Sequence, residues 1–109
     1  MGSKVLPYDA HTPTYELQKV QWLVGQGPLS YKISSAAMMG GKELAIDRHA
    51  IVDVVLSLET DHFYKTMEAK LFPGLWQDVY HLQVGGVELY IKLQIDEDGR
   101  AVVIQFKRR

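Results

Sequence analysis

The sequence contains no cysteine and no long apolar run, and these two absences exclude several classes of protein. Without cysteine the chain can form neither disulfide bonds nor a thiolate metal site. No stretch approaches the roughly 18 apolar residues of a membrane-spanning helix, and residues 1–6 lack the apolar core of about 7 to 15 residues found in a signal peptide. We therefore expect a cytoplasmic protein with no membrane partner.

Histidines are few and their spacing does not suit a preformed metal site. The four are His11, His49, His62 and His81, and none forms an i, i+4 pair or an H-x-H motif. At 109 residues the chain is large enough for one core but not for an additional cofactor domain. We expect a single domain over residues 1–109 that uses no metal and no cofactor.

The chain also has almost no net charge, and this value taken alone argues against binding of nucleic acid. Twelve basic and 13 acidic residues give a net charge of −1, whereas nucleic-acid-binding proteins usually show a basic footprint. The charges are unevenly distributed, however. Residues 1–61 hold five Lys or Arg against seven Asp or Glu, and residues 62–109 hold seven against six. A small active site needs only local positive charge, and the second half could supply it.

The first half of the chain has the apolar periodicity of helices. Thr12 and Pro13 are typical of a helix start, so we expect a helix from Thr14 to Val24. A short strand within 28–33 and a short helix over 35–39, ended by Gly40-Gly41, follow.

The clearest helix is expected from Arg48 to about Leu58, with Asp47 as its N-cap. Its buried stripe comprises Ile51, Val54, Val55 and Leu58.

From Phe63 onward the apolar residues alternate, which predicts an antiparallel sheet. A two-residue turn at Asp98-Gly99 would pair Glu97 with Arg100, Leu93 with Ile104 and Ile91 with Phe106. The same register sets Tyr90 across from Lys107, with Cβ atoms roughly 4.5 to 5.5 Å apart on the solvent face. In the second strand Val102, Ile104 and Phe106 would face the core.

The preceding turn is expected at Gly85-Gly86. Counting back from it places Gln77, Val79 and His81 on the same solvent face. Asp78 would then face the core, where its carboxylate needs hydrogen-bond partners.

The second half contains four motifs rich in aromatic, amide and lysine side chains. They are DHFYKTM at 61–67, WQDVYH at 76–81, LYIKL at 89–93 and VIQFK at 103–107. In this order and at about this spacing they resemble the MqsR family of bacterial toxins, which are small metal-independent ribonucleases that cut messenger RNA. The N-terminal half agrees more loosely, through His11-Thr12-Pro13 and the apolar residues up to Val24.

The resemblance implies an α+β fold: a small antiparallel sheet with helices packed on one face, like the RelE toxins and microbial ribonucleases. It also implies an active site composed of Lys65, Gln77, Tyr90 and Lys107. As further substrate-binding residues we expect Tyr64, Lys92, His81 and Arg108. Relatives differ mostly in the loop from His81 to Gly86 and in the helical half, which affects sequence preference and choice of partner.

Metal-free cleavage of RNA needs a base for the 2′-hydroxyl, positive charge for the phosphorane and an acid for the leaving 5′-oxygen. Lysine and tyrosine can supply all three, and the sequence leaves open which of Lys65, Tyr90 and Lys107 is base or acid. The products would be a 2′,3′-cyclic phosphate and a free 5′-hydroxyl.

The family further implies cleavage without the ribosome at sites containing a GC step. Its partner is an antitoxin with a zinc-binding N-terminal domain and a helix-turn-helix domain, and DNA is contacted only through the complex with that antitoxin. Two alternatives stay open: a ribosome-dependent nuclease of the RelE-like group, and an interaction module that binds protein or RNA without cutting it. The near-neutral charge favours the last.

Overall fold

The computed structural model describes residues 11–109. Residues 1–10, on which the signal-peptide expectation falls, lie outside the described part. The elements are α1 (Leu17–Gly25), β1 (Tyr31–Ile33), α2 (Ser35–Glu43), α3 (Arg48–Ser57), the 3-10 turn η1 (Thr60–His62), β2 (Phe63–Glu68), β3 (Trp76–Val84), β4 (Val87–Ile95) and β5 (Ala101–Arg108).

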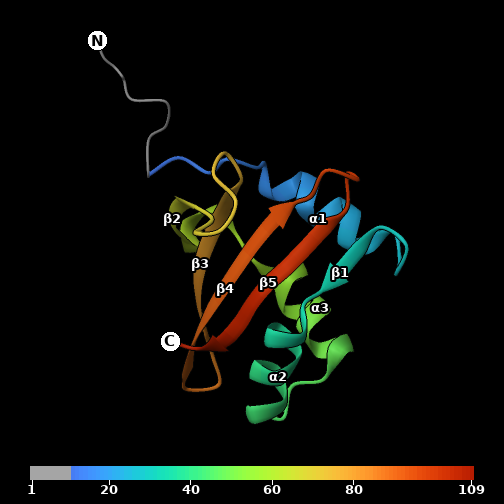
Figure 1. The fold of residues 1–109 in the computed structure, drawn as a ribbon. Helices are drawn as coiled ribbons and strands as arrows, with labels where there is room; N and C mark the ends of the chain where they lie inside the picture. Colours follow the sequence, from blue (N-terminus) through green and yellow to red (C-terminus); the bar gives the residue numbers. More distant parts are fainter. Residues whose placement is uncertain (1–10) are drawn as a thin grey trace.

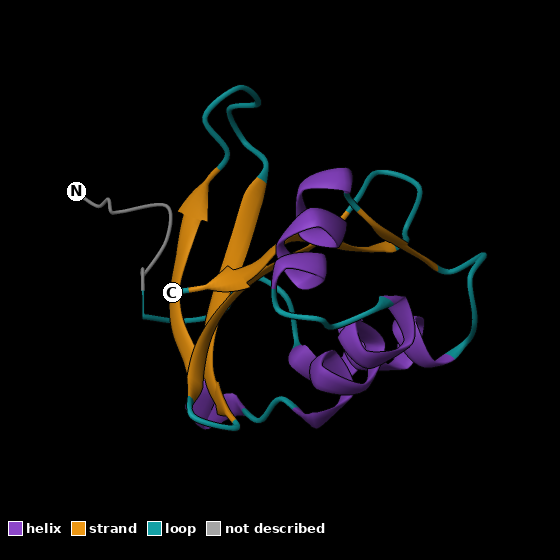
Figure 2. Cartoon of the chain, turned by 90° about the horizontal axis from the view of Figure 1, so that it is seen from below, coloured by secondary structure: helices purple, strands orange, loops and turns teal. Residues whose placement is uncertain are grey.

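The strands form one five-stranded sheet in the order β1-β5-β4-β3-β2 (Figure 1). Strands β2 to β5 are antiparallel, and β1 joins β5 in parallel. The α-helices lie on one side of this sheet (Figure 2). The expected α+β class with a mostly antiparallel sheet is confirmed.

The core lies between the helices and one face of the sheet. From the helices it receives Val20, Ile51 and Val55, and from the central strands Ile91 and Phe106, all at most 2% exposed. Alternation along β4 sends Ile91 into this core and Tyr90 and Lys92 to the opposite face. No helix among residues 11–109 is long and apolar enough to cross a membrane.

Helix α3 begins where the sequence predicts. The Ala50 N–H donates to Asp47 Oδ1 at 2.9 Å, and Ile51, Val55 and Leu58 are buried.

The expected start of α1 at Thr14 is wrong, because α1 begins at Leu17 with Glu16 as its N-cap. The N–H groups of Thr14 and Tyr15 donate instead to the two carboxylate oxygens of Asp78 on β3, at 3.0 and 2.9 Å. These bonds tie the segment before α1 to the sheet. They also give Asp78, which is 1% exposed, the partners that its core-facing position requires.

Gly40-Gly41 does not end α2, contrary to the sequence prediction, and the helix continues to Glu43. The two glycines allow close packing instead. A Cβ on Gly40 would lie 1.9 Å from the Phe106 carbonyl oxygen. Helix α2 thus lies directly against β5 beyond the point where β1 ends, and Ser34 Oγ donates to the Ile104 carbonyl at 2.7 Å. This contact occupies part of a sheet edge that would otherwise expose unpaired backbone groups.

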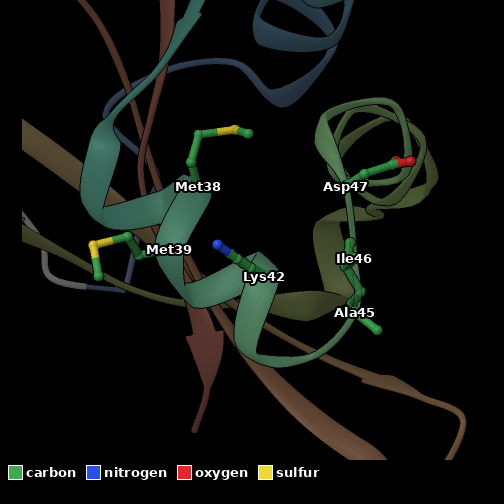
Figure 3. A pocket seen from close by; sticks show the side chains of 6 residues that line it. All are labelled: Met38, Met39, Lys42, Ala45, Ile46 and Asp47. Atoms are coloured by element: carbon green, nitrogen blue, oxygen red, sulfur yellow. The ribbon is translucent and has the colours of Figure 1, made fainter.

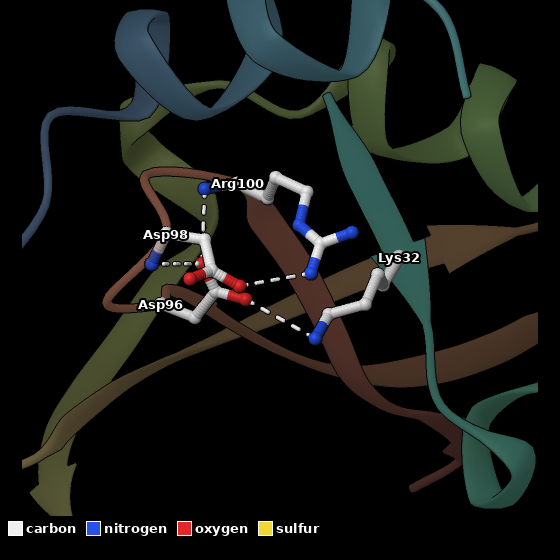
Figure 4. A network of polar contacts seen from close by, with 4 residues as sticks. All are labelled: Lys32, Asp96, Asp98 and Arg100. Atoms are coloured by element: carbon white, nitrogen blue, oxygen red, sulfur yellow. Dashed lines mark hydrogen bonds and ion pairs between the residues drawn. The ribbon is translucent and has the colours of Figure 1, made fainter. Parts of the chain in front are cut away.

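The turn between β4 and β5 is longer than the predicted two residues. Asp96 N–H donates to the Arg100 carbonyl at 2.9 Å, and Gly99 has a φ of 81°, which is the three-residue hairpin loop with a left-handed third residue. Asp96 Oδ1 accepts from the N–H groups of Asp98 and Arg100, both at 3.0 Å, and its Oδ2 lies 3.2 Å from Lys32 Nζ (Figure 4). The carboxylate of Asp96 therefore organises the turn and links it to β1.

A β-bulge compensates for the longer turn. Leu93 pairs with Val103, not with Ile104, and the register shifts by one residue before Lys92 pairs with Gln105. The predicted pairs Glu97–Arg100 and Leu93–Ile104 are therefore wrong, and Val103 joins the core cluster in place of Ile104. Val102 is buried as predicted, with 7% exposure, but lies outside this cluster. Beyond the bulge the predicted register is restored: Ile91 pairs with Phe106 and Tyr90 with Lys107.

The hairpin between β3 and β4 agrees with the sequence prediction. Gly85 and Gly86 both have positive φ and form the turn between Val84 and Val87. Strand β3 extends to Val84, so most of the segment expected to be a loop from His81 is strand. Cross-strand pairing places Val79 beside Lys92 and His81 beside Tyr90.

Candidate active site

The face of the sheet opposite the core carries the predicted site residues in cross-strand rows. One row runs from Lys65 on β2 through Val79 on β3 and Lys92 on β4 to Gln105 on β5. Val79 is fully buried between the two lysines, so the side chains around it cover it while their polar ends lie at the surface.

The next row places Tyr90 between His81 and Lys107. Lys107 Nζ lies 5.1 Å from the centre of the Tyr90 ring, and Lys92 Nζ lies 5.8 Å from it. Two cations thus approach one half-buried phenol, within the range of cation–π attraction. The phenolic group and the ammonium groups are close enough to act on a single phosphate.

Gln77 lies on the other side of the lysine row. Its Nε2 donates to Oε1 of Gln94 at 3.0 Å, and Gln94 is buried with 7% exposure. This bond fixes the orientation of the Gln77 amide and leaves its Oε1 and its second Nε2 hydrogen for a substrate. The position of Gln77 was predicted, but the supporting role of Gln94 was not.

An aromatic pair borders the site at β2. Phe63 pairs with Tyr80 and Lys65 with Val79, so Tyr64 occupies a bulge. Its half-exposed ring stacks on His81 at 4.2 Å between centroids with an interplanar angle of 25°. Aromatic faces of this kind are the usual platforms for unpaired bases of RNA.

The structure brings seven of the eight predicted residues onto one face, and Arg108 is the exception. Arg108 pairs with Leu89, whose side chain is in the core, so strand alternation directs Arg108 to the opposite face. Arg109 lies beside the site instead. Its guanidinium is 5.8 Å from the Tyr64 ring and its Nη1 is 2.8 Å from Glu88 Oε1. Side chains alternate between the two faces of a strand, so Arg109 shares the face of Lys107 and Arg108 does not. The sequence alone could therefore have indicated Arg109 in place of Arg108.

Burial and neighbouring cations shift the acid–base properties of three site residues. For Lys92, desolvation and then the charges of Lys107, Lys65 and Lys70 lower the pKa of the ammonium. For Tyr90, desolvation and then Tyr64 raise the pKa of the phenol. For His81, desolvation and Arg109 lower the pKa of the imidazole against the opposing effect of Glu88.

Other hollows of the molecule differ in character. A cavity of about 460 Å³ lies between α2 and the segment leading to α3, lined by Met38, Met39, Lys42, Ala45, Ile46 and Asp47 (Figure 3). It is mostly apolar and contains none of the predicted site residues. Among residues 11–109, no three His, Asp or Glu side chains gather as a metal site would require.

Comparison with known proteins adds independent information. The sequence model of a family described as "Motility quorum-sensing regulator, toxin of MqsA" matches residues 12–108. The chain is also similar to a protein of Escherichia coli (strain K12) named mRNA interferase toxin MqsR. The two are 27% identical over 101 residues, which cover 93% of this chain and 99% of the relative. Since the family match spans nearly the whole chain, including every predicted site residue, this protein belongs to the MqsR toxin family.

Proposed function

We propose that this protein is the toxin of a toxin–antitoxin pair and an endoribonuclease that cleaves messenger RNA. The name of its E. coli relative, mRNA interferase toxin MqsR, supports this proposal. One observation carries the proposal at the level of chemistry. In a chain of this family, Lys92 and Lys107 lie beside Tyr90 on one face of the sheet, and Lys65 lies in the same cross-strand row as Lys92. This local positive charge outweighs the near-neutral total, because Asp78 points to the core and Glu88 is paired with Arg109.

The reaction that suits this site is transfer of the phosphate to the neighbouring 2′-oxygen. The 2′-hydroxyl loses its proton and attacks phosphorus, and the bond from phosphorus to the 5′-oxygen breaks. Lys65 and Lys107 stabilise the additional negative charge on the phosphorane. Tyr90 exchanges a proton with the reacting oxygens, and Gln77, held by Gln94, orients the nucleotide. The products are a 2′,3′-cyclic phosphate and a free 5′-hydroxyl.

The aromatic pair beside the lysines positions single-stranded RNA. A base next to the scissile phosphate stacks on Tyr64, whose ring is supported by His81. Arg109, whose guanidinium lies beside the Tyr64 ring, binds a neighbouring phosphate. Following the family resemblance, we propose cleavage at sites that contain a GC step, and on RNA without the ribosome.

The partner is proposed to be the cognate antitoxin, in line with the family description "toxin of MqsA". We expect this antitoxin to have a zinc-binding N-terminal domain and a DNA-binding helix-turn-helix domain, so that DNA is contacted only through the complex. Expression of the toxin alone in bacteria should stop growth, and co-expression of the antitoxin gene should restore it.

The decisive experiment is incubation of purified protein with a long RNA in EDTA, with no ribosomes present. Cleavage with cyclic phosphate ends is expected, and Lys107→Ala should abolish most of it. Cleavage only after ribosomes are added would favour the RelE-like alternative. Binding of RNA without any cleavage would favour the interaction module, and a requirement for divalent metal would contradict the mechanism.

A further inference from the structure

Lys92 occupies the centre of the candidate site. Along β4 it lies between Tyr90 and Gln94, two residues away on either side, and across the sheet it lies between Val79 and Gln105. Lys65 is the next residue beyond Val79 in the same row. Lys92 therefore lies beside Tyr90, in the row of Lys65 and within the electrostatic reach of Lys107, while its neighbour Gln94 holds Gln77. The family resemblance assigns catalysis to these four residues, Lys65, Gln77, Tyr90 and Lys107, and not to Lys92.

The surroundings of Lys92 are positively charged on several sides. Lys65 on β2, Lys70 after β2 and Lys107 on β5 all act on its ammonium group, and no carboxylate is among the charges that act on it. The neutral side chains nearby are Tyr90 and Gln94 on the same strand and the cross-strand partners Val79 and Gln105. On β3 the titratable residue facing this region is His81, which pairs with Tyr90.

We propose that Lys92 is the general base of the reaction, with its Nζ taking the proton of the 2′-hydroxyl. The inference rests on the proposed function and deepens it. In this step the neutral amine of Lys92 accepts the proton and becomes an ammonium, while the 2′-oxygen forms its bond to phosphorus. The electron pair of the breaking bond goes to the 5′-oxygen, which receives a proton from the Tyr90 hydroxyl.

The acid–base properties of the two neighbours support this division of roles. Desolvation and adjacent lysines lower the pKa of Lys92, which increases the fraction of free amine. Desolvation raises the pKa of Tyr90, which keeps its hydroxyl protonated. Pairs of groups whose surroundings move their pKa values apart are characteristic of acid–base catalysis. In addition, each protonated lysine that remains near Lys92 stabilises the phosphorane.

His81 is the main competitor for the role of base, because burial and Arg109 lower the pKa of its imidazole against the opposing effect of Glu88. Its position is less favourable. The ring is stacked on Tyr64 at 4.2 Å and tilted against Tyr90 at 5.9 Å, so it is packed between two aromatic side chains. Lys92 has a flexible stem and lies between Gln77 and Tyr90, where the scissile phosphate is expected.

The test compares Lys92→Arg with the unmodified protein on RNA in EDTA. Arginine keeps the positive charge but does not deprotonate in proteins. We expect a rate loss of about 10² to 10⁴ with an unchanged melting temperature. The unmodified protein should become faster as pH rises from about 6 to about 9, because the base must be neutral, and Lys92→Arg should lose this rise. Lys19→Arg on α1 is the matched control and should leave rate and pH profile unchanged.

Two further measurements test whether Lys92 acts as the base or as the acid. An RNA with sulfur in place of the scissile 5′-oxygen has a leaving group that needs no acid, so this substrate should restore Tyr90→Phe but not Lys92→Arg. If the arginine of Lys92→Arg disturbs folding, Lys92→Gln serves as a second variant, because glutamine cannot act as the base either.

Several outcomes would overturn the proposal. Near-normal activity of Lys92→Arg would assign Lys92 to charge stabilisation alone, and restoration of Lys92→Arg by the sulfur substrate would make Lys92 the acid. Loss of the pH rise in His81→Asn with its retention in Lys92→Arg would make His81 the base. An unmodified protein that cuts no RNA would instead contradict the proposed function itself.

Discussion

Tyr90 and Lys107 are direct cross-strand partners on β4 and β5, and the Lys107 ammonium lies 5.1 Å from the centre of the Tyr90 ring. The sheet itself maintains this arrangement, because the core beneath it contains the paired Ile91 and Phe106. The two polar groups therefore occupy a rigid surface instead of a loop. Rigid placement of this kind favours stabilisation of a charged transition state.

Lys107→Ala should lower the rate of RNA cleavage by about 10² or more, because it removes a positive charge next to the scissile phosphate. Lys107 is exposed near the end of its strand, so the melting temperature should hardly change. Cleavage of a defined RNA and thermal unfolding should be measured on the same preparation, with Lys19→Ala as the control. An equal loss of stability and activity would show that the lysine is structural.

Tyr90→Phe should reduce cleavage by about 10² to 10⁴ if the phenolic hydroxyl transfers a proton, since the substitution keeps the ring and its packing. Bacteria that express the variant should grow, whereas the unmodified chain at the same level of folded protein should stop growth. Undiminished toxicity of Tyr90→Phe would exclude proton transfer by this residue.

The register at Tyr90 and Lys107 could be predicted although two steps of the prediction were wrong. Alternation of apolar residues and the glycine of the turn indicated the correct strands. The turn is longer than predicted because the side chain of Asp96 accepts backbone hydrogen bonds. The bulge opposite Leu93 adds a residue to β5 and cancels the shift. Neither the longer turn nor the bulge can be recognised from the periodicity of apolar residues, because each depends on local hydrogen bonds and tertiary packing.

Other features were missed because they depend on contacts between distant segments. Gly40 resembles a helix stop in sequence, and only the approach of α2 to Phe106 explains its position within the helix. Similarly, Thr12 and Pro13 suit a helix start, but the bonds from Thr14 and Tyr15 to Asp78 delay the helix. Motifs on β2 to β5 were easier to interpret, since alternation within a single strand already separates the two faces.

Asp96→Asn should make the stability of the protein less dependent on pH. Although burial opposes it, hydrogen bonds from the Arg100 N–H and from Lys32 lower the pKa of Asp96 overall. A carboxylate whose pKa is lower in the folded than in the unfolded protein stabilises the fold. This stabilisation is fully present at pH values above the unfolded pKa of about 3.9, and it is lost as the pH falls through the folded pKa. The variant should therefore be less stable by about 0.5 to 1 kcal/mol at neutral pH and equally stable in strong acid. Urea unfolding at several pH values measures the difference in unfolding free energy between the variant and the unmodified protein. A difference that stays constant with pH would contradict the prediction.

Gly40→Ala should destabilise the protein although alanine is the better helix former. The new Cβ would lie 1.9 Å from the Phe106 carbonyl oxygen and 3.3 Å from Lys107 Cβ, and relief requires a shift of α2 away from β5. We expect a loss of about 2 to 3 kcal/mol or more. Gly25→Ala in α1 meets no atom within 4 Å and should be neutral or slightly stabilising. Similar unfolding free energies for the two variants would show that α2 does not approach β5 so closely.

Asp78→Ala should lower stability while it leaves the chemistry of the folded protein intact. The substitution removes both acceptors of the Thr14 and Tyr15 N–H groups and leaves these donors unsatisfied, at a cost of about 2 to 4 kcal/mol. Asp78→Asn keeps one acceptor and should lie between the alanine variant and the unmodified protein, and Asp61→Ala is an exposed control. Because Asp78 lies on the core face, cleavage per folded molecule at low temperature should stay near normal. A normal melting temperature for Asp78→Ala would mean that the link between the segment before α1 and β3 contributes nothing, and a specific loss of cleavage would place Asp78 in the active site.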